Sequence, residues 1–170
     1  MKSLRQGKKL GGSGFTLMEL MVSSAISLLV VVVTISSFIY SLRSWYGILL
    51  RLDTDQDANI AVSRMVYGMD DRWGLRCAAR VKLTGNNDAW MLTYGTGGVT
   101  PQTNSFTWSK ATGELVFNPG AKIAGRNISL AQVFTNAFKP HSVVVTVRVD
   151  RVQGTLSARR EIGTEISFRN

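Results

Sequence analysis

The hydrophobic pattern begins with a long apolar segment near the N-terminus. From Leu20 to Leu42 the chain has 23 residues without a formal charge. As a helix with a rise of about 1.5 Å per residue, this segment would span about 35 Å, enough to cross a hydrocarbon core of about 30 Å. The β-branched run Val30–Val33 favours a strand in water, but in lipid a single segment satisfies its backbone hydrogen bonds only as a helix. The pattern therefore predicts a transmembrane helix over residues 15–42.

The charges before this segment predict its orientation. Lys2, Arg5, Lys8 and Lys9 precede it, without any acidic residue. Because basic flanks favour the cytoplasmic side, we expect a cytoplasmic N-terminus and a head across the membrane. A secretory signal peptide is the alternative, but its apolar core is usually shorter and ends in small residues at a cleavage site. No such end precedes Arg43.

Helix-like spacing continues beyond the apolar segment. Large apolar residues recur mostly three or four positions apart from Trp45 to Trp73, which predicts a helix that continues to about Arg72. Tyr40, Trp45 and Tyr46 flank the end of the span, as expected of an interfacial aromatic belt, although the same residues would also suit the core of the head.

An acidic motif lies within this second helical stretch. Asp53, Asp55 and Asp57 match the start of a calcium loop, which then requires glycine at its sixth position and glutamate at its twelfth. The chain has Ala58 and Arg64 at those positions, so the pattern disfavours calcium. A solvated acidic face, or a cap where the helix is interrupted near Asp53, explains the aspartates better.

After Gly74 the pattern changes to short runs with period-two alternation, which indicates an antiparallel sheet. Strands are expected at residues 78–83, 90–94, 105–109, 114–118, 142–150 and 155–168. Residues 110–113 are expected to form a hairpin turn with Gly113 at positive φ, and residues 95–104 a mobile loop. In the clearest strand, the valines at 143, 145, 147 and 149 form a core face before a turn at Gln153–Gly154. The whole pattern predicts an α+β fold, a long N-terminal helix packed on an antiparallel sheet.

Charge and chemistry narrow the possible functions. The formal net charge is +9, but from residue 43 onward sixteen Lys and Arg face ten Asp and Glu, and these charges are dispersed. This is a mildly basic head rather than a nucleic-acid stripe. Cys77 and His141 are the only residues of their kinds, so the chain has no internal disulfide, no metal-ligand spacing and no Ser-His-Asp pattern. We therefore expect neither an enzyme nor a cofactor, and we interpret the sequon at Asn127 as a chance match.

Glu19 is the anomaly of the apolar segment. A carboxylate just inside a span is costly and usually has a partner or a function, and no basic residue lies within one helical turn of it. The alternative, which we disfavour, is a carboxylate that reaches the interface from a plain signal anchor.

The stretch Gly14–Val22, GFTLMELMV, resembles the prepilin peptidase recognition motif of type IV pilins and type II secretion pseudopilins. The shared features are a short basic leader that ends in glycine, phenylalanine as the first mature residue, glutamate as the fifth, and an unbroken apolar helix. The resemblance covers about the first 42 residues. A second and weaker resemblance, at the C-terminal residues 166–170, is to the closing strand of J-type or W-type minor pilins.

The resemblance implies a pilin-like fold and a structural role. A membrane peptidase would cut between Gly14 and Phe15, remove a leader of residues 1–14 and N-methylate Phe15. Glu19 would then pair with the N-terminal amine of a neighbouring subunit, a favourable exchange for a buried carboxylate. The implied partners are prepilin peptidase, other pilins or pseudopilins, the assembly platform of the bacterial inner membrane and its lipid. The head, residues 43–170, would be periplasmic or extracellular.

Two departures and one alternative accompany the resemblance. Many major pilins have a helix-kinking proline in mid-span where this chain has Ser36, and many have a C-terminal cysteine pair that this chain lacks. The presence of Glu19 argues against the type II secretion tip subunit, which typically lacks it. The alternative function is a DNA- or surface-binding minor pilin, suggested by the basic head and by Trp90, Phe106 and Trp108, although strand aromatics more often belong to a core. Nucleic acid is thus a disfavoured partner.

Overall fold

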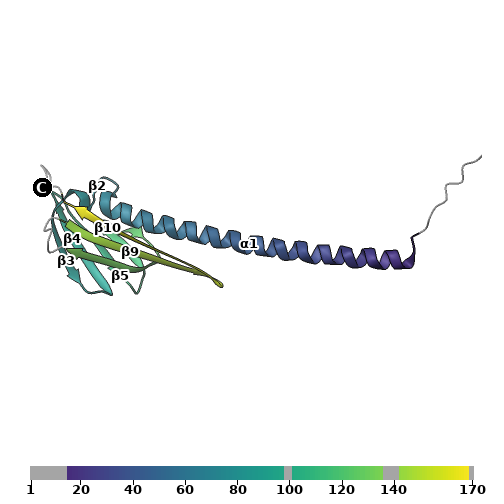
Figure 1. The fold of residues 1–170 in the computed structure, drawn as a ribbon. Coiled ribbons are helices and arrows are strands. Elements are labelled where there is room, and N and C mark those ends of the chain that lie inside the picture. The colour runs from purple at the N-terminus through teal and green to yellow at the C-terminus, as the bar shows by residue number, and fades with distance from the viewer. Residues whose placement is uncertain (1–14, 98–100, 136–141, 169–170) are drawn as a thin grey trace, which may run out of the picture. The chain divides into compact units, whose positions relative to one another are not determined.

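The computed structural model describes residues 15–97, 101–135 and 142–168. Its contacts divide the chain into two compact units, Met1–Ser44 and Trp45–Asn170. One helix, α1 (Leu17–Tyr67), contributes to both units. All of the strands belong to the second unit, which we call the head (Figure 1).

The described part of the first unit is helical from Leu17 and solvent-exposed throughout. Some hydroxyl groups in it donate within the helix: Ser27 donates to the carbonyl of Ser23 and Ser36 to that of Val32, both at 2.8 Å. Such bonds to the preceding turn allow hydroxyl groups to occupy an apolar environment. This part of α1 is long and apolar enough to cross a membrane.

α1 ends at Tyr67, five residues before the end that the apolar spacing predicts. Gly68 has φ +101°, and a Cβ there would lie 2.0 Å from the carbonyl oxygen of Arg72. The chain reverses in a small hairpin, β1 (Gly68–Met69) and β2 (Arg72–Trp73), instead of continuing as a helix. The prediction of a helix to Arg72 is wrong because the spacing of apolar residues contains no information about the positive φ of Gly68.

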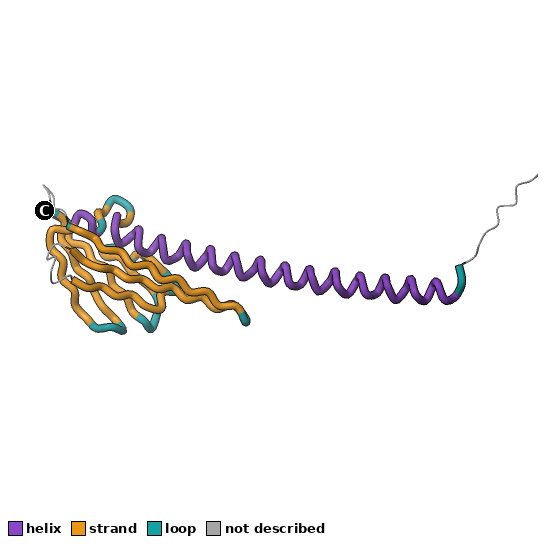
Figure 2. The backbone as a smooth tube through the Cα atoms, in the orientation of Figure 1, coloured by secondary structure: helices purple, strands orange, loops and turns teal. Residues whose placement is uncertain are grey.

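The head contains two larger antiparallel sheets (Figure 2). The five-stranded sheet has the order β3-β4-β5-β6-β7, with β3 (Ala78–Gly85), β4 (Ala89–Thr96), β5 (Thr103–Ser109), β6 (Glu114–Asn118) and β7 (Lys122–Gly125). The three-stranded sheet has the order β10-β9-β8, with β8 (Ile128–Thr135), β9 (Ser142–Gln153) and β10 (Leu156–Ser167). A 3-10 turn at Leu75–Cys77 leads into β3.

Every strand expected from the sequence is present. The predicted turns are confirmed as well: Gly113 has φ +65° between β5 and β6, and Gly154 has φ +61° between β9 and β10. The sequence does not predict β1, β2, β7 or β8. The loop predicted at residues 95–104 is too long, because β4 extends to Thr96 and β5 begins at Thr103.

One core joins the sheets to the C-terminal half of α1. Ala58, Ala61 and Met65 face it from the helix and are fully buried. The four alternate valines of β9 are also fully buried, which confirms the predicted core face: Val143, Val145, Val147 and Val149. Gly125 lets the helix approach closely, because a Cβ at this position would lie 2.8 Å from the Cβ of Ala61. The coarse α+β prediction is therefore confirmed.

Candidate functional site

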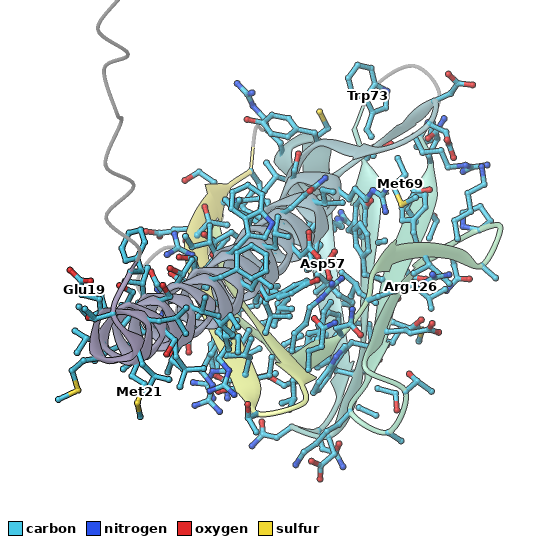
Figure 3. All side chains as sticks on the ribbon, turned by 90° about the vertical axis from the view of Figure 1, so that its right-hand side faces the viewer. Glu19, Met21, Asp57, Met69, Trp73 and Arg126 are labelled. Atoms are coloured by element: carbon cyan, nitrogen blue, oxygen red, sulfur yellow. The ribbon has the colours of Figure 1, made fainter. Side chains whose placement is uncertain are left out.

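The start of α1 is organised by reciprocal hydrogen bonds between Thr16 and Glu19. Glu19 Oε2 accepts from the Thr16 amide at 3.0 Å and from its hydroxyl at 3.1 Å, while the Glu19 amide donates to Thr16 Oγ1 at 3.3 Å. This is a capping box, in which each side chain satisfies a free backbone N–H of the first turn. Figure 3 shows Glu19 at this end of the helix.

The capping box gives Glu19 a local partner that the sequence interpretation missed. The signal was present, since Thr followed three residues later by Glu before an apolar run is a helix-start pattern. The carboxylate also lies where the helix dipole favours negative charge. Glu19 therefore has a local role at the start of the helix, in addition to any role between subunits.

The other residues of the predicted cleavage site are partly described. Phe15 precedes the helix and its side chain is 82% exposed. Gly14 and the four basic residues before it lie outside the described residues. Between Glu19 and Arg43 the helix surface carries no formal charge, and its large apolar side chains are exposed. A surface of this kind requires lipid or other protein around it.

The three aspartates of the D-x-D-x-D motif form ion pairs with the three-stranded sheet. Arg151 on β9 contacts Asp57 at 2.6 Å and Asp53 at 3.4 Å, and Arg160 on β10 contacts Asp55 at 3.5 Å. The helix runs through all three positions, so the predicted interruption near Asp53 is wrong. Within the described residues no three His, Cys, Asp or Glu side chains are placed to hold a metal ion.

The aromatic residues that suggested nucleic-acid binding belong to the core. Trp90, Trp108 and Phe106 are 6%, 2% and 0% exposed, so none offers a face on which a base can stack. Trp90 instead donates its indole N–H to the carbonyl of Ala131 at 2.7 Å. Trp45 and Tyr46 are more than half exposed and are not part of the head core.

The remaining candidate groups do not form a catalytic arrangement in the described part of the chain. Cys77 is a half-buried free thiol, and His141 lies outside the described residues. Burial raises the pKa of the Tyr94 phenol far above its usual value, outweighing a hydrogen bond with Asn104 that lowers it. The phenol stays protonated and donates to the carbonyl of Trp73 at 2.9 Å, which anchors the small hairpin.

Comparisons of the chain with family models, with curated proteins and with solved structures found no match.

Proposed function

We propose that this chain is a minor subunit of a type IV pilus or of a type II secretion pseudopilus. It is processed between Gly14 and Phe15, N-methylated at Phe15 and assembled through its N-terminal helix. The observation that carries the proposal is the carboxylate of Glu19, four residues after Phe15, at the start of a helical segment that carries no other formal charge before Arg43.

The local structure is compatible with both proposed steps. Phe15 and Thr16, the two residues that follow the scissile bond, lie outside the helix, which begins at Leu17. After cleavage the new amine of Phe15 is a cation next to the capping box. A carboxylate that already bonds Thr16 retains lone pairs for an amine from another subunit.

The role is structural rather than catalytic. In the head, the three aromatic residues that suggested nucleic-acid binding are buried in the core, and Asp53, Asp55 and Asp57 are in ion pairs. The exposed surface of α1 between Glu19 and Arg43 is apolar and suits packing between helices in a filament.

N-terminal mass analysis of the chain from its own cells tests the proposal. We expect a terminus at methylated Phe15 in the wild type and an unprocessed Met1 terminus in Gly14→Val, which removes the small residue before the cut. An intact Met1 terminus in wild-type chain, in cells with active prepilin peptidase, would contradict it.

A further inference from the structure

Strands β9 and β10 form a long hairpin beside the part of α1 that belongs to the head (Figure 1). Near one end of β10, residues 164–167 line a hollow together with Tyr67 of α1. Near its other end, residues 157–160 line a hollow together with Arg51. Lower residue numbers on β10 therefore lie beside lower residue numbers on α1. The turn of the hairpin, at residues 153–154, thus points toward the end of the head at which α1 enters it.

The tip of this hairpin is uncharged and carries an exposed apolar side chain. We call residues 152–157, VQGTLS, the hairpin tip. Val152 is 75% exposed. It lies three positions after the buried Val149, so strand alternation places it on the sheet face away from α1. A single exposed valine is ordinary at a protein surface, so its surroundings decide what it meets.

The chain itself brings a bilayer to this end of the head. The uncharged segment ends at Leu42, and only Arg43 and Ser44 separate it from Trp45, the first residue of the head. Three residues reach about 11 Å at most, so a bilayer crossed by the segment is always close to Trp45. Trp45 and Tyr46 are more than half exposed, and such aromatic side chains favour the headgroup layer.

The length of the apolar segment favours a contact between the head and that bilayer. As a helix the segment spans about 35 Å, whereas the hydrocarbon core is about 30 Å thick. A helix longer than the core tilts to match it, and a tilt lowers one side of the attached head toward the surface. A tilt toward the hairpin side brings the sheet face that carries Val152 down to the headgroups.

The charges near the hairpin tip are compatible with an anionic lipid surface. The hairpin tip and residues 43–52 contain no Asp or Glu, so no carboxylate there repels anionic headgroups. Arg159 lies just beyond the hairpin tip and pairs with Asp150, on the same sheet face as Val152. Its side chain is 68% exposed and bonds Asp150 through Nε at 2.7 Å, which leaves further N–H donors for lipid phosphates.

A protein partner fits the hairpin tip less well than lipid does. A specific protein interface buries about 800 Å² on each partner, around a centre of large apolar or aromatic side chains. The hairpin tip offers only Val152, with exposed Gln153 and Thr155 beside it. Insertion of one valine between lipid headgroups needs no shaped partner surface.

We propose that the hairpin tip docks on the headgroup layer of the membrane that α1 crosses, with Val152 inserted toward the acyl chains. This second contact, in addition to the helix, holds the head against the membrane surface. The inference requires that α1 crosses a membrane, and it does not depend on the function proposed above.

Nitroxide spin labels on the full-length chain, in vesicles of phosphatidylethanolamine and phosphatidylglycerol, test the docking. A label at Ser157→Cys, which is exposed and pairs with Val152 across the hairpin, should be shielded from a water-soluble nickel complex and open to oxygen. A label at Phe134→Cys should be open to the nickel complex. Phe134 is exposed and pairs with Val144, eight positions or about 26 Å from Val152 on the same sheet face. Both chains carry Cys77→Ser, so that each has one labelling site.

A substitution in the hairpin tip separates lipid contact from local shielding. Val152→Asp should make the Ser157 label at least about fivefold more accessible to the nickel complex, because a carboxylate is repelled by anionic headgroups. Met91→Asp makes the same kind of change at an exposed apolar residue of β4 and should leave the accessibility unchanged.

Two results would overturn the docking. One is equal accessibility of the Ser157 and Phe134 labels, whether high or low. The other is shielding at Ser157 that disappears when the chain is diluted in lipid, which would assign the hairpin tip to a contact with a second copy. Neither result bears on processing at Phe15 or on filament assembly, because the vesicles contain neither the peptidase nor other subunits.

Discussion

Two tryptophans in the head differ in whether the indole N–H has a hydrogen-bond partner. Trp90 and Trp108 are both buried and their ring centroids lie 6.3 Å apart. The indole N–H of Trp90 donates to Ala131, whereas that of Trp108 is buried without a hydrogen-bond partner. A buried donor without a partner costs stability, while a paired one contributes to it.

Substitution of each tryptophan by phenylalanine measures this difference. Trp90→Phe leaves the Ala131 carbonyl without its indole donor and should lower the free energy of unfolding more than Trp108→Phe does, by about 1 kcal/mol. Both variants lose a similar ring volume, so each serves as the control for the other. Thermal unfolding of the full chain in detergent gives the comparison, and an equal or larger loss for Trp108→Phe would show that the Ala131 bond contributes little.

At the scale of elements, the head depends on a close approach of α1 to β7. A Cβ at Gly125 would lie 2.8 Å from Ala61 Cβ and 2.9 Å from Ile128 Cδ1. Gly125→Ala should therefore overpack this contact and destabilise the head by about 1–3 kcal/mol. Gly163→Ala on β10 is the matched control, since its nearest neighbour would be Thr146 Oγ1 at 3.6 Å. Equal melting temperatures for the two variants would refute the tight approach.

Ion pairs between α1 and β9 form a second link between the helix and the sheets of the head. Asp57 and Arg151 are 25% and 30% exposed and their atoms lie 2.6 Å apart. A double-mutant cycle of Asp57→Ala and Arg151→Ala should give a coupling of about 1 kcal/mol, the upper end for pairs near the surface. The same cycle at Asp88 and Lys110, which are 71% and 63% exposed, should give a value near zero. A near-zero coupling at Asp57 as well would show that this ion pair contributes nothing measurable to stability.

How far the sequence predicts these elements depends on the range of the interactions. The valine alternation in β9 is local and strong, so the strand and its buried face were predictable. The end of α1 was not, because Met69 and Trp73 continue the helical spacing past Gly68. The partner of Asp53 lies 98 residues away on β9, and spacing along the chain contains no information about it.

At the scale of the whole molecule, Glu19 has two possible contributions that one pair of variants separates. Glutamine also completes a capping box, so Glu19→Gln keeps the start of α1 while it removes the charge. Glu19→Ala removes both. If Glu19 pairs with an amine of a neighbouring subunit, both variants should reduce incorporation into sheared filaments by roughly tenfold or more.

The experiment must also show that the variant chains are still made, inserted in the membrane and processed. Processing at Phe15 and the amount of chain in the membrane should stay unchanged in Glu19→Gln. Filament incorporation by Glu19→Gln at the wild-type level, with a loss only in Glu19→Ala, would assign Glu19 to the capping box alone.

The strand order has a consequence for the solubility of the chain. β8 is an edge strand whose sequence, ISLAQVFT, has no charge and no proline, whereas β10 and β3 at other sheet edges carry arginine, lysine or glutamate. Uncharged edges are sites where two molecules add strand to strand and aggregate. The Trp90 indole occupies the carbonyl of Ala131 on this strand, so a second molecule cannot extend the sheet past that point without displacing it. The Trp90 indole therefore withholds one hydrogen-bond acceptor of this edge from an incoming strand.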